Sequence, residues 1–118
     1  MDAATGNIYC GLYEFVDMAI VLHPLRPGDL FIDVGANIGS YNVLAAGACG
    51  ADVVAIEPEP EAARAHGANI DINGLEGRAE IVAAAAGPAA GIARLTRGLG
   101  AMNSILMSRR RSTGLCGW

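Results

Sequence analysis

The stretch Phe31-Ile-Asp-Val-Gly-Ala-Asn-Ile-Gly39 decides the fold. Its start belongs to a short apolar run, Leu30–Val34, which a glycine follows at once and which is typical of a buried parallel strand. A helical segment comes next, and a second buried strand, Val53–Ile56, ends at the acidic residue Glu57. A strand, a glycine-containing turn, a helix and a strand with an acidic end, in this order, predict a nucleotide-type cofactor site in a doubly wound fold.

The rest of the chain continues the alternation of helices and strands. Helical periodicity marks three segments: Leu12–His23, Ile38–Ala48 and Glu59–Asn73. A third strand is expected at Glu80–Ala85, and Ile92–Thr96 is a candidate for a short fourth strand. This order predicts an α/β domain with a parallel sheet and right-handed crossovers.

Three residues of the pattern have physical roles in such a site. Gly35 permits a tight turn without a Cβ clash, and Gly39 lets the helix approach both the strand and the ligand. The helix N-terminus presents amide groups and a partial positive charge to an anion. Glu57 can accept hydrogen bonds from both hydroxyls of a ribose. Together they predict a ligand with an anionic group and a ribose.

The spacing of the glycines distinguishes between cofactors. A dinucleotide fingerprint reads G-x-G-x-x-G, whereas this chain has G-x-x-x-G with Asn37 between the two glycines. Asp33 stands two residues before the first glycine, where a carboxylate repels a pyrophosphate but accepts an ammonium group. S-adenosylmethionine has a ribose, an adenine and an amino-acid end with an ammonium group, so we expect this cofactor rather than NAD.

Three motifs resemble those of the FkbM family of S-adenosylmethionine-dependent methyltransferases. They are Asp33-Val-Gly-Ala-Asn-Ile-Gly39, Glu57-Pro58-Glu-Pro60 and Asn69-Ile-Asp-Ile-Asn73-Gly-Leu, and the resemblance covers roughly residues 9 to 105. The family implies a class I Rossmann-like methyltransferase fold. As an activity it implies methyl transfer to a hydroxyl oxygen of a sugar or a natural product.

The resemblance also implies roles for individual residues. The amino-acid end of the cofactor would be lined by Asp33, Gly35, Asn37 and Gly39. Glu57 would hold the ribose, and Pro58 would pack beside the adenine. Ala84 or Ala85 would lie near the adenine edge and offer backbone groups. No residue is assigned as a catalytic base, and no metal is expected.

Members of the family continue to a fourth strand that ends in an Asp-x-Glu-Gly motif, which this sequence lacks. We therefore expect residues 1–107 to form a partial Rossmann-like S-adenosylmethionine-binding domain with an N-terminal lead-in helix. Residues 108–118 are expected to be a disordered tail. Three alternatives to an active methyltransferase stay open: an inactive fragment of one, an NAD-dependent oxidoreductase half-domain, and a non-catalytic truncated product.

Polar residues outside the motifs are expected to have structural roles. His66 is expected at the surface, and Glu14 on a solvated helix face, with contact to the amino-acid end of the cofactor as its alternative. Asn69 and Asn73 are expected to cap the end of their helix.

Composition excludes several kinds of partner. The net charge of −4 and the isoelectric point of about 4.9 argue against a broad cationic surface for nucleic acid or anionic lipid. No run of about 18 apolar residues and no signal peptide is found, so no membrane partner is expected.

The 3 cysteines are far apart, which argues against a disulfide framework or a cysteine-built zinc site and favours the cytoplasm. The expected partner is a small-molecule or glycan acceptor, and the oligomeric state is left open.

Overall fold

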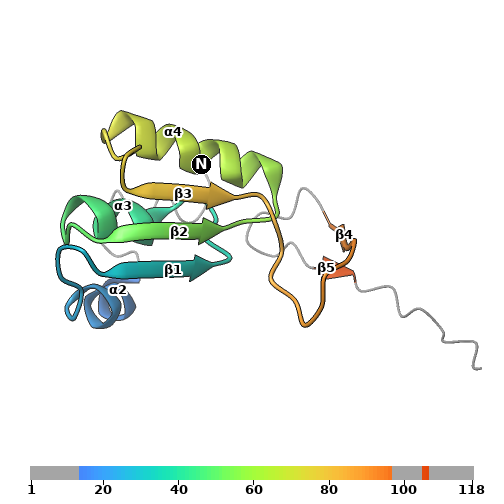
Figure 1. Ribbon diagram of the computed structural model, residues 1–118, viewed down its shortest axis with the longest axis horizontal. Coiled ribbons are helices and arrows are strands. Elements are labelled where there is room, and N and C mark those ends of the chain that lie inside the picture. The colour runs from blue at the N-terminus through green and yellow to red at the C-terminus, as the bar shows by residue number, and fades with distance from the viewer. Residues whose placement is uncertain (1–13, 97–104, 107–118) are drawn as a thin grey trace, which may run out of the picture.

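The computed structural model describes residues 14–96 and 105–106 of the chain. Three helices are described: α2 (Phe15–Leu22), α3 (Ser40–Gly47) and α4 (Pro60–Ile72). The strands are β1 (Leu30–Val34), β2 (Asp52–Ile56), β3 (Ala79–Val82), β4 (Arg94–Leu95) and β5 (Ile105–Leu106). Helices and strands alternate along the chain up to β3 (Figure 1). This confirms the predicted α/β class.

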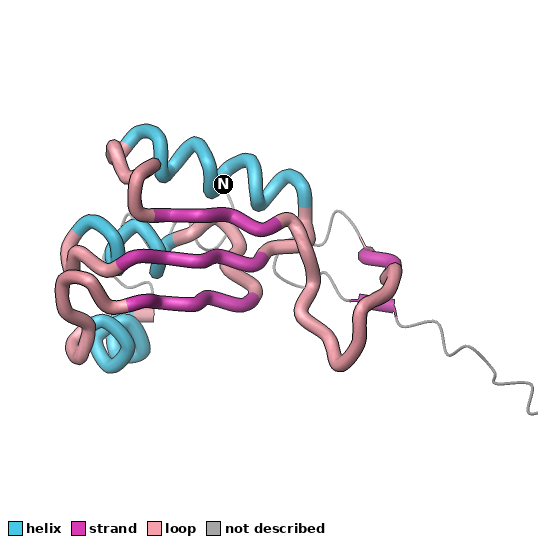
Figure 2. The backbone as a smooth tube through the Cα atoms, in the orientation of Figure 1, coloured by secondary structure: helices cyan, strands magenta, loops and turns pink. Residues whose placement is uncertain are grey.

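The first three strands form one parallel sheet in the order β1-β2-β3, and their arrows point the same way in Figure 1. Leu30 pairs with Asp52, and Val53 pairs with Ala79. The connections run through α3 and α4, as Figure 2 shows by the alternation of strand and helix tube. Because neighbouring parallel strands end at the same edge of a sheet, the loops after β1 and β2 lie next to each other.

One face of the sheet is covered by helices. Ala45 and Ala46 of α3 are buried against Val53, and Phe31 and Ala79 from the neighbouring strands pack on this cluster. The opposite face carries Leu30, Ile32 and Val34 of β1, whose side chains are 60%, 56% and 60% exposed. The core is therefore one-sided and is built largely from alanine, so each residue in it buries little apolar area.

Local signals explain where α4 begins and ends. The side chain of Glu59 accepts a hydrogen bond from Ala62 N at 2.7 Å and caps the first turn, and Pro60 occupies the first helical position. Asn73 Nδ2 donates to Asn69 O at 2.7 Å at the other end, and Gly74 follows with a φ of 63°. The expected capping role of Asn73 is confirmed.

The apolar residues that give α2 its helical periodicity are not the ones that pack on the core. Phe15, Val16 and Ile20, which recur at helical spacing in the sequence, are 66–72% exposed. Leu22 instead packs on the core cluster. Glu14, directly before the helix, has a φ of 39°, and its Oε2 accepts a hydrogen bond from Tyr41 OH at 2.8 Å. Glu14 thus joins α2 to α3.

The segment after β3 leaves the parallel sheet. β3 ends at Val82, three residues before the predicted end, because the alanines that follow have a low preference for strands. The predicted fourth strand is present as β4, but it pairs antiparallel with β5 in a separate two-stranded sheet. Residues 108–118 lie outside the described residues, so the disordered tail stays a prediction. Within residues 14–96 and 105–106, no helix is both long and apolar enough to cross a membrane.

Candidate functional site

The glycine loop, residues 35–39, connects β1 to α3 at the carboxyl edge of the sheet. It is anchored to the neighbouring strand, because Gly35 N and Ala36 N both donate to Ile56 O, at 2.8 and 3.3 Å. Three of its residues have a positive φ: 82° at Gly35, 51° at Asn37 and 83° at Gly39. Asparagine is one of the few residues other than glycine that tolerate this conformation. The observed sequence therefore suits the shape of the loop.

Glu57 connects this loop to the end of β2. Its side chain is 7% exposed. Oε2 accepts a hydrogen bond from Asn37 N, and Oε1 accepts one from Glu59 N, both at 2.8 Å. A carboxylate has about four lone-pair positions, so acceptor capacity remains for a ligand hydroxyl. The structure thus places the predicted ribose residue against the predicted loop.

Asp33 lies at the end of β1, beside the same loop. Burial raises the pKa of this carboxyl above its ordinary value of 3.8. A hydrogen bond from Asn42 opposes the rise in the pKa, and the charge of Glu57 adds to it. An ammonium group bound here would favour the charged carboxylate of Asp33. The environment of Asp33 therefore fits a cationic ligand group better than an anionic one.

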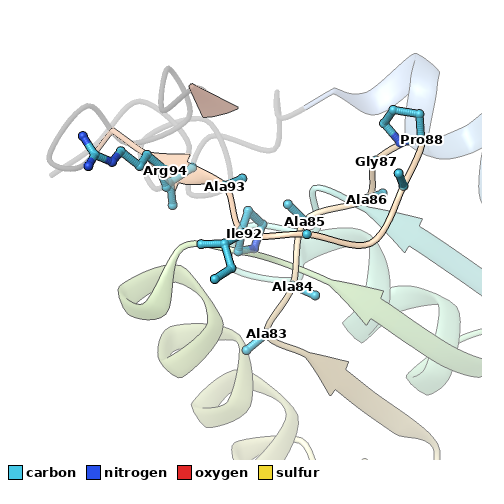
Figure 3. A pocket seen from close by; sticks show the side chains of 13 residues that line it. Ala83, Ala84, Ala85, Ala86, Gly87, Pro88, Ile92, Ala93 and Arg94 are labelled. Atoms are coloured by element: carbon cyan, nitrogen blue, oxygen red, sulfur yellow. The ribbon is translucent and has the colours of Figure 1, made fainter. Parts of the chain in front are cut away.

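A hollow of about 570 Å³ is lined by Pro58, the residue after Glu57, and by the segment that follows β3. Pro58 forms one part of its wall, and the segment from Ala83 to Leu95 forms the rest. Figure 3 shows that this segment carries mostly small side chains, with Ile92 and Arg94 among its longer ones. Pro58, Ala84 and Ala85, the residues implied for the adenine, therefore line one hollow.

Two side chains of α4, His66 and Asn69, contact the glycine loop, and both have roles other than the predicted ones. The prediction that His66 lies at the surface is wrong, because its side chain is fully buried. Asn69 Nδ2 donates to Ile38 O at 2.8 Å and so holds the loop, which is a different role from the predicted helix cap. Their spacing of three residues on one helix face was the only signal in the sequence that could have linked them.

The two glycines of the loop have different surroundings. A Cβ built on Gly39 would overlap the ring of His66. A Cβ built on Gly35 would meet nothing within 4 Å. Gly39 is therefore required by the protein's own packing, whereas Gly35 leaves space at the edge of the sheet where a ligand would lie.

The amides of the loop are less available than the sequence suggests. Those of Gly35, Ala36 and Asn37 bond to Ile56 O and Glu57, and Gly39 N donates to Ala36 O at 2.9 Å. Val43 N, which donates to Gly39 O, is the first amide within the ladder of α3. The first turn of α3 carries the partial positive charge of the helix N-terminus and is the better candidate for a ligand carboxylate.

No protein-family model matches the sequence, and no curated protein matches it. Solved structures do match. An S-adenosylmethionine-dependent methyltransferase from Thiobacillus denitrificans, crystallised with S-adenosyl-L-homocysteine, has a TM-score of 0.52 at 16% identity, covering 58% of this chain and 27% of that one. An RNA methyltransferase from Salinibacter ruber, also with S-adenosyl-L-homocysteine, has a TM-score of 0.54 at 23% identity, covering 59% and 45%.

A third match is PH0793 from Pyrococcus horikoshii, whose structure was described as that of a transferase. Its TM-score is 0.52 at 31% identity, covering 60% of this chain and 26% of that one. The matched part thus spans less than half the length of each of these three proteins. The fold is the class I Rossmann-like fold of S-adenosylmethionine-dependent methyltransferases, and the chain covers part of it.

Proposed function

We propose that this chain binds S-adenosylmethionine at the carboxyl edge of its sheet and provides the cofactor-binding part of a methyltransferase. The contact between Glu57 and Asn37 N carries the proposal, because it joins an acidic strand end to a glycine loop, and Pro58, the residue after Glu57, lines an open hollow. The proposal is further supported by two structural matches that were crystallised with S-adenosyl-L-homocysteine.

The residues fit the three parts of the cofactor. Glu57 can accept hydrogen bonds from ribose hydroxyls with its remaining lone pairs. Asp33 can pair with the ammonium group, and the open space at Gly35 admits the amino-acid end. Pro58 and the alanines after β3 offer an apolar wall to the adenine. A bound S-adenosylmethionine supplies an electrophilic methyl group, so the protein needs chiefly to orient the reactants.

For the acceptor, we propose a hydroxyl oxygen of a sugar or natural product, as the resemblance to the FkbM family implies. The acidic net charge of −4 supports a small-molecule or glycan acceptor over a nucleic acid. We further place the protein in the cytoplasm, in line with its separated cysteines.

Calorimetric titration of the chain with S-adenosyl-L-homocysteine, and separately with NAD, tests the cofactor assignment. We expect binding of S-adenosyl-L-homocysteine and none of NAD. Glu57→Gln should weaken binding about 10-fold or more, since hydrogen bonds to a charged group contribute about 1.5–3 kcal/mol. Glu61→Gln is the matched control, because Glu61 lies in the first turn of α4 and is exposed.

The other outcomes of this titration decide between the remaining functions. Binding of NAD alone would overturn the proposal in favour of an oxidoreductase half-domain. Binding of neither compound would favour a non-catalytic product. Binding of S-adenosyl-L-homocysteine that Glu57→Gln leaves unchanged would remove Glu57 from the site.

A further inference from the structure

The glycine loop is held from two directions, and each of them fixes a different half of it. The amides of residues 35–37 donate to the end of β2, at Ile56 O and Glu57 Oε2. Ile38 and Gly39 instead contact side chains of α4. The position of the second half of the loop therefore depends on this helix.

Asn69 of α4 holds the peptide unit that joins Ile38 to Gly39. Its Nδ2 donates to Ile38 O at 2.8 Å, although the two residues are 31 positions apart in the sequence. The amide of the same peptide unit, Gly39 N, donates to Ala36 O at 2.9 Å. A peptide unit is planar, so hydrogen bonds at both of its polar atoms fix the orientation of the whole plane. Removal of the Asn69 side chain would leave only the bond within the loop.

His66, about one turn earlier on α4, holds the end of the loop by packing. Its ring lies against Gly39, in the space that a Cβ would fill. The side chain is fully buried, and its Nε2 lies 3.3 Å from Asn42 Nδ2 in the first turn of α3. Because protein interiors are close-packed, a shift of the ring would be passed on to the loop and to α3.

Both contacts act on the place where α3 begins. Gly39 is the N-cap residue of α3, so its position sets where the partial positive charge of the helix N-terminus lies. In the proposed site, that charge would face the carboxylate at the amino-acid end of the cofactor. The ribose and the adenine are assigned instead to Glu57 and Pro58, which follow β2. The two ends of the cofactor thus depend on different supports.

We propose that His66 and Asn69 are positioning residues, which place Ile38, Gly39 and the start of α3 for the amino-acid end of the cofactor. This inference rests on the proposed function for the identity of the ligand. Neither side chain needs to touch the ligand, because each acts through the backbone of the loop. A loop that is in its binding position for only part of the time binds more weakly by that fraction, so the loss falls on the amino-acid end.

Calorimetric titration of the full chain with two ligands separates the two ends of the cofactor. S-adenosyl-L-homocysteine has both ends, whereas 5′-methylthioadenosine has the adenosine and the sulfur without the amino-acid end. Asn69→Ala should raise the dissociation constant of S-adenosyl-L-homocysteine about 3- to 10-fold, as expected for the loss of one hydrogen bond. The dissociation constant of 5′-methylthioadenosine should stay unchanged.

Asn73→Ala is the matched control. Asn73 Nδ2 also donates one hydrogen bond to a backbone carbonyl, Asn69 O at 2.7 Å, but it lies at the exposed end of α4. Its loss weakens the helix end without releasing the loop, so both dissociation constants should stay unchanged. No rise in Asn69→Ala, equal rises for its two ligands, or an equal rise for S-adenosyl-L-homocysteine in the two variants would contradict the positioning role of Asn69.

His66→Gln tests the packing contact in a chain that keeps a polar partner for Asn42. A flexible amide replaces the rigid ring beside Gly39, so affinity for S-adenosyl-L-homocysteine should fall while that for 5′-methylthioadenosine stays. His66→Ala removes the contact entirely and should have the larger effect. His23→Gln is the control, because His23 is exposed. A His66→Gln chain that binds both ligands as the unmodified chain does would contradict the role of His66.

A measurement without ligand separates failure of this inference from failure of the proposed function. In NMR spectra of the unliganded chain, Asn69→Ala should shift the backbone amide signals of Gly39 and Ser40 more than Asn73→Ala does. No binding of either ligand to the unmodified chain would overturn the proposed function, and the NMR spectra would still decide whether α4 positions the loop. Amide signals of Gly39 and Ser40 that Asn69→Ala leaves in place would overturn the inference alone.

Discussion

Glu57 Oε2 lies 2.8 Å from the backbone nitrogen of Asn37, and this hydrogen bond ties the end of β2 to the glycine loop after β1. The loop contains three residues with a positive φ, so it needs such support. The same carboxylate also accepts from Glu59 N. Glu57 therefore stabilises the site as well as offering it an acceptor.

Replacement of Glu57 by alanine should lower stability strongly. Two backbone amides would lose their acceptor, and an unsatisfied buried donor costs about 1–3 kcal/mol. We expect a loss of about 2–5 kcal/mol in the free energy of unfolding, measured by urea denaturation. Glu61→Ala, in the exposed first turn of α4, should cost less than about 1 kcal/mol. Equal losses in the two variants would show that the amides of Asn37 and Glu59 do not depend on Glu57.

The two loop glycines should respond differently to alanine. Gly35→Ala has space for its Cβ and should cost only the strain of its φ, about 1–2 kcal/mol, while it weakens binding of S-adenosyl-L-homocysteine. Gly39→Ala should cost more, because its Cβ would overlap His66. Thermal denaturation and calorimetric titration of both variants check this contrast. The double variant Gly39→Ala with His66→Ala should regain part of the loss in melting temperature.

Stability should fall as the pH drops below 6.5. The folded-state pKa of His66 is lower than its unfolded value of 6.5, so between the two values the unfolded chain binds a proton that the folded chain does not. The contribution of neutral His66 to stability is complete above pH 6.5, and it decreases progressively as the pH falls to the folded-state pKa. Asp33 acts in the opposite direction, because its folded-state pKa is above 3.8 and the folded chain therefore binds a proton between the two values that the unfolded chain does not. Urea denaturation at a series of pH values measures this.

His66→Gln is the diagnostic variant for this pH profile. It should abolish the decrease in stability just below pH 6.5, whereas His23→Gln should keep it, because His23 is exposed. A profile that is the same in all three chains would assign the decrease to another group.

We expect the sheet face that lies opposite the helices to cause self-association of the chain. Leu30, Ile32 and Val34 are more than half exposed on β1, and no described strand pairs with its outer edge. Ile32→Lys should therefore reduce the concentration dependence of sedimentation in the ultracentrifuge. Ile72→Lys is the control, since Ile72 is 82% exposed at the end of α4, away from this face. A chain that is monomeric at all concentrations would contradict the prediction.

The sequence was sufficient to predict the elements of the sheet and the residues that meet at its edge. β1 was predicted with its observed bounds, because an apolar run followed by a glycine is a local signal. The proximity of Glu57 to the glycine loop followed from the parallel order alone. Both conclusions depend on short stretches of sequence and on a topology with few alternatives.

Features that depend on tertiary packing could not be predicted. Helical spacing in α2 identified a helix, but its neighbours decide which face is buried, and Phe15 lies outward. A histidine in a helix that also contains arginine and glutamate indicates a surface position, yet His66 faces inward because Gly39 leaves room for its ring. This space exists only after two crossovers have brought the two residues together.

The contacts between α4 and the glycine loop affect how the loop unfolds locally. His66 and Asn69 contact the loop from one face of the helix, so the loop cannot open fully while α4 stays docked. The amide hydrogens of Asn37 and Gly39 should then exchange with solvent at the opening free energy of α4 rather than at that of a surface loop. The segment that would receive the cofactor therefore belongs to the same cooperative unit as the second crossover helix.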